Sequence, residues 1–124
     1  MPWIDLCLKA TASGITGEAG SATGGLAAVD AANGQIVWKH LFNSVDSGAA
    51  TIAGNVVFTS TYNGVIYALS DRTGAVLWTA QAPAGINSFP AITKDMLIIG
   101  AGAPTAAKSR QDEIIAYALA GKRT

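Results

Sequence analysis

Cysteine is nearly absent from this chain, and charged residues are scarce. Cys7 is the sole cysteine among 124 residues, which excludes an intrachain disulfide and leaves a zinc site without a second thiolate ligand. Eight basic residues balance eight acidic ones, so the positive surface expected of a protein that binds the nucleic-acid backbone is missing. We therefore predict no nucleic-acid partner, and a buried, unreactive Cys7.

The sequence also lacks a hydrophobic run long enough to form a membrane helix. The longest run, residues 96–103, is far shorter than the ~20 residues that a spanning helix needs. The N-terminal segment has no basic region and carries Asp5 where a signal peptide would be apolar. We predict no membrane span and no signal peptide within these residues.

What the chain does have is apolar residues and glycine. Half of its residues are hydrophobic, 14 are glycine and only 13% are charged. This balance favours short buried strands joined by tight turns over charged amphipathic helices, and it excludes a disordered chain.

A repeat organises the sequence. Trp38 and Trp78 lie 40 residues apart and end two similar phrases, GGLAAVDAANGQIVW and GVIYALSDRTGAVLW. With the tryptophans in register, Gly34 matches Gly74, and the same offset aligns residues 51–60 with 91–100. The repeat therefore covers its whole period.

Each period divides into four short strand patterns, separated by turn-forming residues such as Gly54-Asn55 and Arg72-Thr73-Gly74. We name the strands A to D; in the central period they are residues 49–53, 56–60, 65–70 and 75–79. A four-stranded unit of 40 residues with a recurring Gly and Trp is typical of a propeller blade. The predicted fold class is all-β, a partial β-propeller of about two and a half four-stranded antiparallel blades.

The flanks predict incomplete blades around the complete one. We divide the single fragment 1–124 into a partial blade 1–38, a full blade 49–79 and a partial blade 89–119. In the first, Trp3 to Leu8 is predicted as strand B, followed by a long loop to Gly24; in the last, Asp112 to Leu119 is predicted as strand C. Open terminal sheets lack partners, so we expect completion by the remaining blades of a longer parent or by self-association, and an aggregation-prone or oligomeric chain in isolation.

The recurring tryptophans are interpreted as structural. Trp38 and Trp78 each follow a glycine turn, at Gly34 and Gly74, by four residues. Each ring then leaves strand D at the same place and docks against the adjoining blade. A ligand site is usually singular, whereas a wedge between sheets recurs in every blade, so we predict that Trp78 is buried against a neighbouring sheet.

These phrases resemble the PQQ enzyme repeat, the blade unit of quinoprotein alcohol dehydrogenases and of related non-catalytic propellers. The segments that carry the resemblance are Gly25 to Asp30, Asn33 to Trp38, Gly64 to Leu69 and Thr73 to Trp78. The resemblance implies an eight-bladed parent, a periplasmic or otherwise extracytoplasmic location, and, in the dehydrogenases, PQQ and calcium held on the propeller axis by several blades. The outer-membrane assembly lipoprotein of Gram-negative bacteria resembles the repeat too, and it does no redox chemistry.

Because successive strands run in opposite directions, alternate connections lie at the same end of each sheet, and this predicts where a site would lie. The B-to-C and D-to-A connections share one end of the sheets and include all the longer loops, so this end is the better candidate for binding. Its polar candidates are His40, Asp46, Asn87, Ser88, Arg110 and Asp112. We expect His40 to be a solvent-exposed loop residue, and Asn87 and Ser88 to be directed toward the axis, where they are weak candidates for cofactor binding. No catalytic or metal-binding set is predicted.

Three functions stay open at this point. The chain is a segment of a quinoprotein-type dehydrogenase of alcohols or sugars, inactive alone; or part of a non-catalytic binding propeller, such as an outer-membrane protein assembly factor; or a remnant with neither role. Fold does not decide among them.

Overall fold

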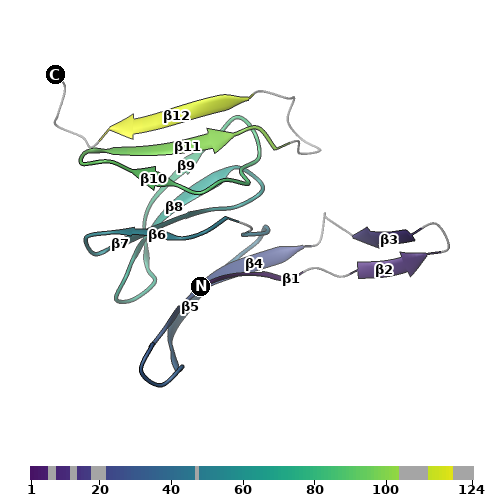
Figure 1. Ribbon diagram of the computed structural model, residues 1–124, viewed down its shortest axis with the longest axis horizontal. Coiled ribbons are helices and arrows are strands. Elements are labelled where there is room, and N and C mark those ends of the chain that lie inside the picture. The colour runs from purple at the N-terminus through teal and green to yellow at the C-terminus, as the bar shows by residue number, and fades with distance from the viewer. Residues whose placement is uncertain (6–7, 12–13, 18–21, 47, 104–111, 119–124) are drawn as a thin grey trace.

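The structure, a computed structural model, describes residues 1–5, 8–11, 14–17, 22–46, 48–103 and 112–118. These residues contain strands and turns but no helix. Figure 1 shows three antiparallel sheets stacked face to face, with a separate two-stranded hairpin projecting to one side. The all-β, partial-propeller fold class is confirmed.

The second sheet is the complete blade. Its strands pair in chain order as β6 (Thr51–Ala53), β7 (Val56–Ser60), β8 (Val65–Ser70) and β9 (Val76–Gln81). Strands B and C have the predicted bounds, strand A begins two residues later than predicted, and strand D runs on to Gln81. The predicted four-stranded meander is therefore correct.

The first sheet contains three strands, β1 (Pro2–Asp5), β4 (Thr23–Val29) and β5 (Ile36–Phe42). Strand β1 pairs antiparallel with β4, as a B strand should. The prediction that this strand extends to Leu8 is wrong, because β1 ends at Asp5 and Leu8 belongs to a strand of a different sheet.

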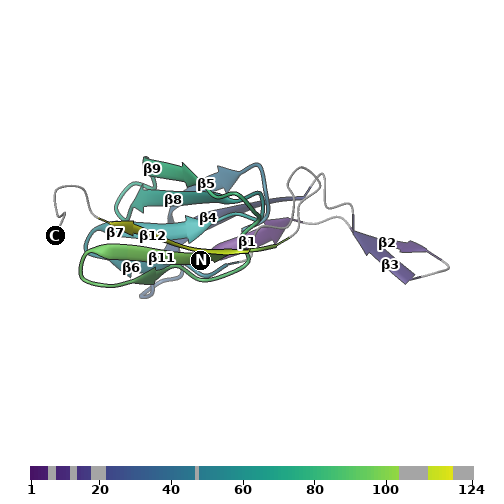
Figure 2. The ribbon, with the colours of Figure 1, turned by 90° about the horizontal axis from the view of Figure 1, so that it is seen from above.

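The connection between β1 and β4 is not a plain loop, as we had expected. It carries a hairpin of β2 (Leu8–Thr11) and β3 (Gly14–Gly17), which lies well away from the three sheets in both views (Figures 1 and 2). The second sheet has a short turn between β7 and β8 at the equivalent place, so the 40-residue repeat did not predict the hairpin.

The third sheet is again incomplete. It consists of β10 (Ala91–Ile92), β11 (Met96–Ala101) and β12 (Glu113–Ala118), paired in chain order. These are the A, B and C strands of the repeat. The predicted end of the C strand at Leu119 lies outside the described residues.

Strand D is irregular at the same place in both sheets that contain it. Ala28 pairs with Trp38 but Val29 pairs with Ile36, which leaves Val37 as an extra residue in β5. In β9 the extra residue is Leu77, between the pairs Ala68 with Trp78 and Leu69 with Val76. This β-bulge breaks the two-residue alternation, which explains why the neighbours Ile36 and Val37 are both more than half exposed.

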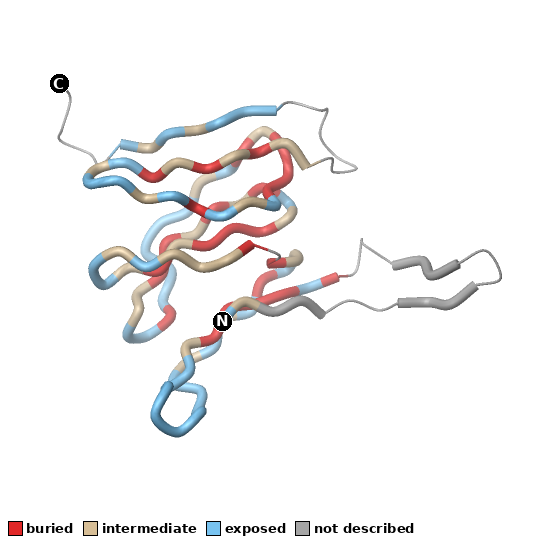
Figure 3. Tube along the Cα trace, in the orientation of Figure 1, coloured by how far each residue is buried: buried red, intermediate tan, exposed pale blue. Residues whose placement is uncertain are grey.

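Two apolar layers hold the sheets together, and Figure 3 shows the buried residues concentrated along the strands that line them. The layer between the first and second sheets consists of Leu26, Phe42, Val57 and Leu69, with Trp38, Ala50 and Tyr67 packed against it. The layer between the second and third sheets consists of Ile66, Ala82, Ala84, Ile86, Leu97, Ile99 and Ala101. Each sheet buries its faces only against its neighbours, as the blade pattern requires.

The two repeat tryptophans lie in different surroundings. Trp38 crosses from β5 to the second sheet, where its Nε1 donates a hydrogen bond to the Asp71 carbonyl oxygen at 2.6 Å. Its ring also lies directly over Gly74. Trp78 instead meets Tyr117 edge to face, with 5.3 Å between ring centroids, and stays 40% exposed. Trp78 is therefore not buried as predicted, and residues 119–124, which follow β12, lie outside the described residues.

Candidate functional site

The connections from B to C and from D to A meet at one end of the stacked sheets, and they frame a pocket between the second and third sheets. Its volume is about 730 Å³. It is lined by Tyr62, Asn87, Ser88, Gly100, Ala101, Gly102, Ala103, Asp112, Glu113 and Ile114. These residues come from the turn after β7, the segment before β10, and the two ends of the β11-to-β12 connection.

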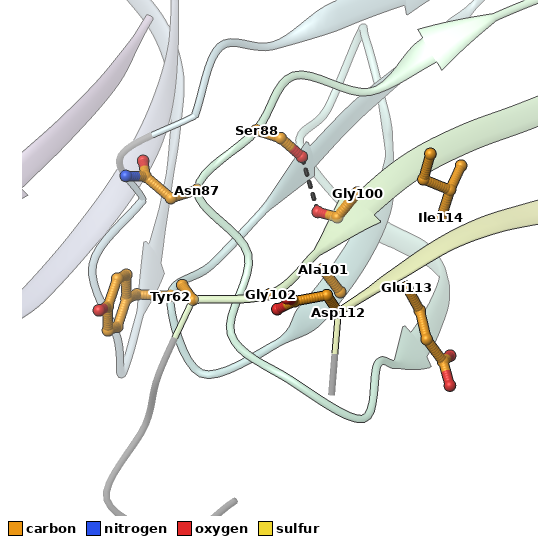
Figure 4. A pocket seen from close by; sticks show the side chains of 10 residues that line it. Tyr62, Asn87, Ser88, Gly100, Ala101, Gly102, Asp112, Glu113 and Ile114 are labelled. Carbon is orange, nitrogen blue, oxygen red and sulfur yellow. Dashed lines mark hydrogen bonds between the residues drawn. The ribbon is translucent and has the colours of Figure 1, made fainter. Parts of the chain in front are cut away.

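The geometry of the lining is partly fixed by hydrogen bonds and close packing. Ser88 donates its hydroxyl hydrogen to the Gly100 carbonyl oxygen at 2.8 Å, so this hydroxyl is left as an acceptor toward the pocket. The Asp112 carboxyl group lies against Gly102, where a β-carbon would come within 2.8 Å of Oδ1. Figure 4 shows Tyr62 and Asn87 on one side of the pocket, with Glu113 and Ile114 on the other.

Three of the predicted polar candidates meet in this pocket, namely Asn87, Ser88 and Asp112. Asn87 is exposed and Ser88 is half-buried. Sequence reasoning missed Tyr62 and Glu113, although Tyr62 stands in a predicted B-to-C turn and Glu113 follows a candidate directly.

Two other candidates lie elsewhere, and our expectation for each was wrong. His40 is on strand β5 and not in a loop, because that strand continues to Phe42; its ring is half-buried, 5.0 Å from the Phe42 ring. Asp46 is 1% exposed and accepts hydrogen bonds from Thr59 on β7, so it is no part of the surface. Arg110 lies outside the described residues.

Burial changes the titration of two groups beneath this end of the sheets. Desolvation raises the pKa of the Asp46 carboxyl group to about 6, against the lowering effects of the Thr59 hydrogen bond and the N-terminal amine. Desolvation likewise raises the pKa of the Tyr67 phenol, which the hydrogen bond with Thr61 lowers and the neighbouring Asp46 charge raises further. Neither group lines the pocket.

The pocket offers oxygen donors but no positive charge among its lining residues. An amide, two hydroxyl groups and two carboxyl groups suit a hard cation, which takes six to eight oxygen ligands. They include no basic partner for the carboxylates of an anionic quinone such as PQQ. Within the described part of the chain, no three His, Cys, Asp or Glu residues gather closely enough to hold a metal ion. The pocket is therefore at most one wall of a cofactor site.

None of the described residues forms a helix that is long and apolar enough to cross a membrane.

Comparison with known proteins extends this picture. A quinoprotein ethanol dehydrogenase from Pseudomonas aeruginosa is 38% identical over 68 residues, which are 54% of this chain and 11% of that protein. The chain thus spans about a tenth of the length of this relative.

Solved structures share the fold. The quinohemoprotein alcohol dehydrogenase ADHIIG from Pseudomonas putida matches with a TM-score of 0.68 and 24% identity, over 86% of this chain and 18% of that one. BamB from Moraxella catarrhalis matches with a TM-score of 0.51 and 26% identity, over 77% of this chain and 29% of that one.

A family model described as outer membrane protein assembly factor BamB matches residues 22–123. This range includes the complete blade, both repeat tryptophans and every described residue of the pocket. The chain belongs to this family of PQQ-like β-propeller repeats.

Proposed function

We propose that the chain is a blade segment of a quinoprotein-type dehydrogenase of alcohols or sugars, in which it supplies one wall of the cofactor site and is inactive alone. The observation that carries this proposal is the pocket at the loop-rich end of the sheets, where Asn87, Ser88 and Asp112 come together. The likeness to the quinoprotein ethanol dehydrogenase of Pseudomonas aeruginosa supports the dehydrogenase class.

What this wall of the pocket would contribute follows from the hydrogen bonds that its side chains can make. If the parent binds PQQ, the quinone would supply the redox chemistry, and a calcium ion would take oxygen ligands from several blades. Asn87 would donate or accept a single hydrogen bond, worth ~1 kcal/mol net, while Ser88 would present only its acceptor lone pair. These contributions are small compared with the several kcal/mol that association costs through the loss of translational and rotational freedom. Positive charge must therefore come from blades outside this chain.

Titration of the purified 124-residue chain with PQQ and calcium tests the statement that it is inactive alone. We expect no saturable binding at micromolar concentration and no dye-linked oxidation of alcohols. Micromolar binding with turnover would overturn the single-wall assignment. In the parent protein, Asn87→Ala should weaken PQQ binding, whereas Asn55→Ala, an exposed amide on the A-to-B turn at the opposite end, should not.

A second candidate function is supported by the family description and by the likeness to BamB. In that case the same pocket belongs to a binding scaffold in envelope assembly, and no cofactor is held. The gene sequence on both sides separates the two proposals. A haem-attachment Cys-x-x-Cys-His motif in the same gene favours the dehydrogenase. Either function places the parent outside the cytoplasm.

A further inference from the structure

The buried carboxyl group of Asp46 stands at a repeat position where the next blade has an apolar side chain. The 40-residue offset places Asp46 on Ile86 and Thr59 on Ile99, and all four residues are at most 1% exposed. The same layer is therefore polar beside the second sheet and apolar beside the third. Since burying a carboxyl group without full hydrogen bonding costs stability, the polar version calls for an explanation.

Thr59 supplies the Asp46 carboxyl group with a single hydroxyl group, whose hydrogen bond lowers the pKa of Asp46 by less than burial raises it. Thr59 Oγ1 lies 2.9 Å from Asp46 Oδ2 and 3.1 Å from Oδ1. A hydroxyl group has one hydrogen, so it donates to only one of these oxygens. A protonated carboxyl group uses both contacts, because it donates to Thr59 Oγ1 from one oxygen and accepts from the same hydroxyl group at the other.

Asp46 belongs to a short segment that fastens the first sheet to the second. We call residues 43–46, which follow the end of β5, the latch segment. The Val45 carbonyl oxygen accepts a hydrogen bond from the Tyr62 amide at 2.8 Å, and Ser44 Oγ accepts one from the Asn63 amide at 3.2 Å. The latch segment therefore holds the turn after β7, and the buried side chain of Asp46 lies in the middle of this attachment.

Few titratable groups act on this carboxyl group. Tyr67 on β8 interacts with it, as does the N-terminal amine next to β1. On β5, the His40 ring contacts Phe42 instead. Burial is the main influence on Asp46, and it favours the neutral form.

We propose that Asp46 is a protonation-controlled latch between the first two sheets, closed when its carboxyl group carries a proton and loosened when the proton leaves. The direction of the effect follows from linkage. A carboxyl group with a raised folded-state pKa stabilises the closed form fully below its ordinary value of 3.8, and this contribution is lost as pH rises to about 6. The opening equilibrium should rise about tenfold per pH unit over this window, about a hundredfold in all, and then level off.

Hydrogen exchange of the Tyr62 and Asn63 amides in the full chain tests this proposal. Protection factors, corrected for the intrinsic pH dependence of exchange, are measured between about pH 4 and about pH 8. We expect protection of both amides to fall by about a hundredfold and to level off above about pH 6. In Asp46→Asn, which is neutral throughout, protection should stay flat across this range.

The matched control is Asp95→Asn, which removes a partly exposed carboxyl group from a turn where the previous blade carries Asn55. This variant should keep the wild-type profile. Protection that is independent of pH in the wild type, or a profile that persists in Asp46→Asn, would overturn the latch. Should Asp46→Asn fail to fold, carbon NMR titration of the Asp46 carboxyl group in the wild type decides, because a midpoint near 3.8 contradicts the proposal.

Discussion

The contact between the first and second sheets and the contact between the second and third use the same repeat position in two ways. Trp38 makes a hydrogen bond to Asp71 and covers Gly74, both on the C-to-D turn of the next blade. Trp78, 40 residues later, meets the Tyr117 ring edge to face and is 40% exposed. The two tryptophans therefore occupy the same repeat position, but among the described residues only Trp38 has a C-to-D turn packed against it.

The glycines of the C-to-D turns, Gly34 and Gly74, also differ in whether a tryptophan ring packs against them. Gly34 and Gly74 both have φ above +70°, but a β-carbon on Gly34 would meet nothing within 4 Å, whereas one on Gly74 would lie 2.5 Å from Trp38 Cε3. Gly34 is required for its backbone conformation alone. Gly74 is required for conformation and for space.

Truncating the two tryptophans should have the largest effect and should separate the two contacts. We expect Trp38→Ala to lower the free energy of unfolding by ~3–5 kcal/mol, because it removes a packed ring and its hydrogen bond. Trp78→Ala should cost only about 1–2 kcal/mol, since much of that ring is already in water. Urea denaturation of the chain measures both values. Equal losses would contradict the asymmetry of the two contacts.

Alanine at the two glycines should give the next largest difference. Gly34→Ala should cost ~1–2 kcal/mol, the strain of a left-handed backbone conformation. Gly74→Ala should cost about 3 kcal/mol or more, because its methyl group also collides with Trp38. In a Trp38→Ala background, the cost of Gly74→Ala should fall to that of Gly34→Ala, which a double-mutant cycle measures. A cost that persists unchanged would mean that the ring does not set the space.

Substitutions in the two buried layers should change stability by smaller amounts, and by different amounts in each layer. At neutral pH, Thr59→Val leaves Asp46 without its hydroxyl donor and should cost about 2 kcal/mol. Ile99→Val at the equivalent position should cost about 1 kcal/mol, the loss of a buried methylene group. The double variant Asp46→Ile with Thr59→Val copies the apolar layer and should regain the stability that Thr59→Val loses. Thermal unfolding followed by circular dichroism gives all three values, and a double variant less stable than Thr59→Val would show that the layer needs its polar groups.

The strands could be predicted from the sequence because the repeat, the turn residues and the alternation of apolar residues all agree. Strands β7 and β8 have their predicted bounds for this reason. The hairpin β2–β3 was missed because it lies outside the repeat. The exposure of Trp78 was missed because the burial of a side chain depends on the sheet that packs against it, which the residues around the tryptophan do not encode.

The candidate site was only partly predictable. The alternation of strand direction placed Asn87, Ser88 and Asp112 at the correct end of the sheets, because strand direction alone decides which connections meet. The burial of Asp46 was missed although its signal was present, since the 40-residue offset places it on Ile86 and places Thr59 on Ile99. A polar residue that replaces a core residue of its own repeat is expected inside, not on the surface.

The bulge in strand D carries a consequence for how such a chain tolerates genetic change. Val37 and Leu77 are each one residue in excess of their partner strand, and the tryptophan follows directly. Deleting Val37 would leave the pairs Ala28 with Trp38 and Val29 with Ile36 in one regular register and would remove the bulge from strand D. Unequal recombination that adds or removes a whole unit of 40 residues preserves this bulge. Genes for such proteins should therefore gain and lose whole units more readily than single codons in strand D.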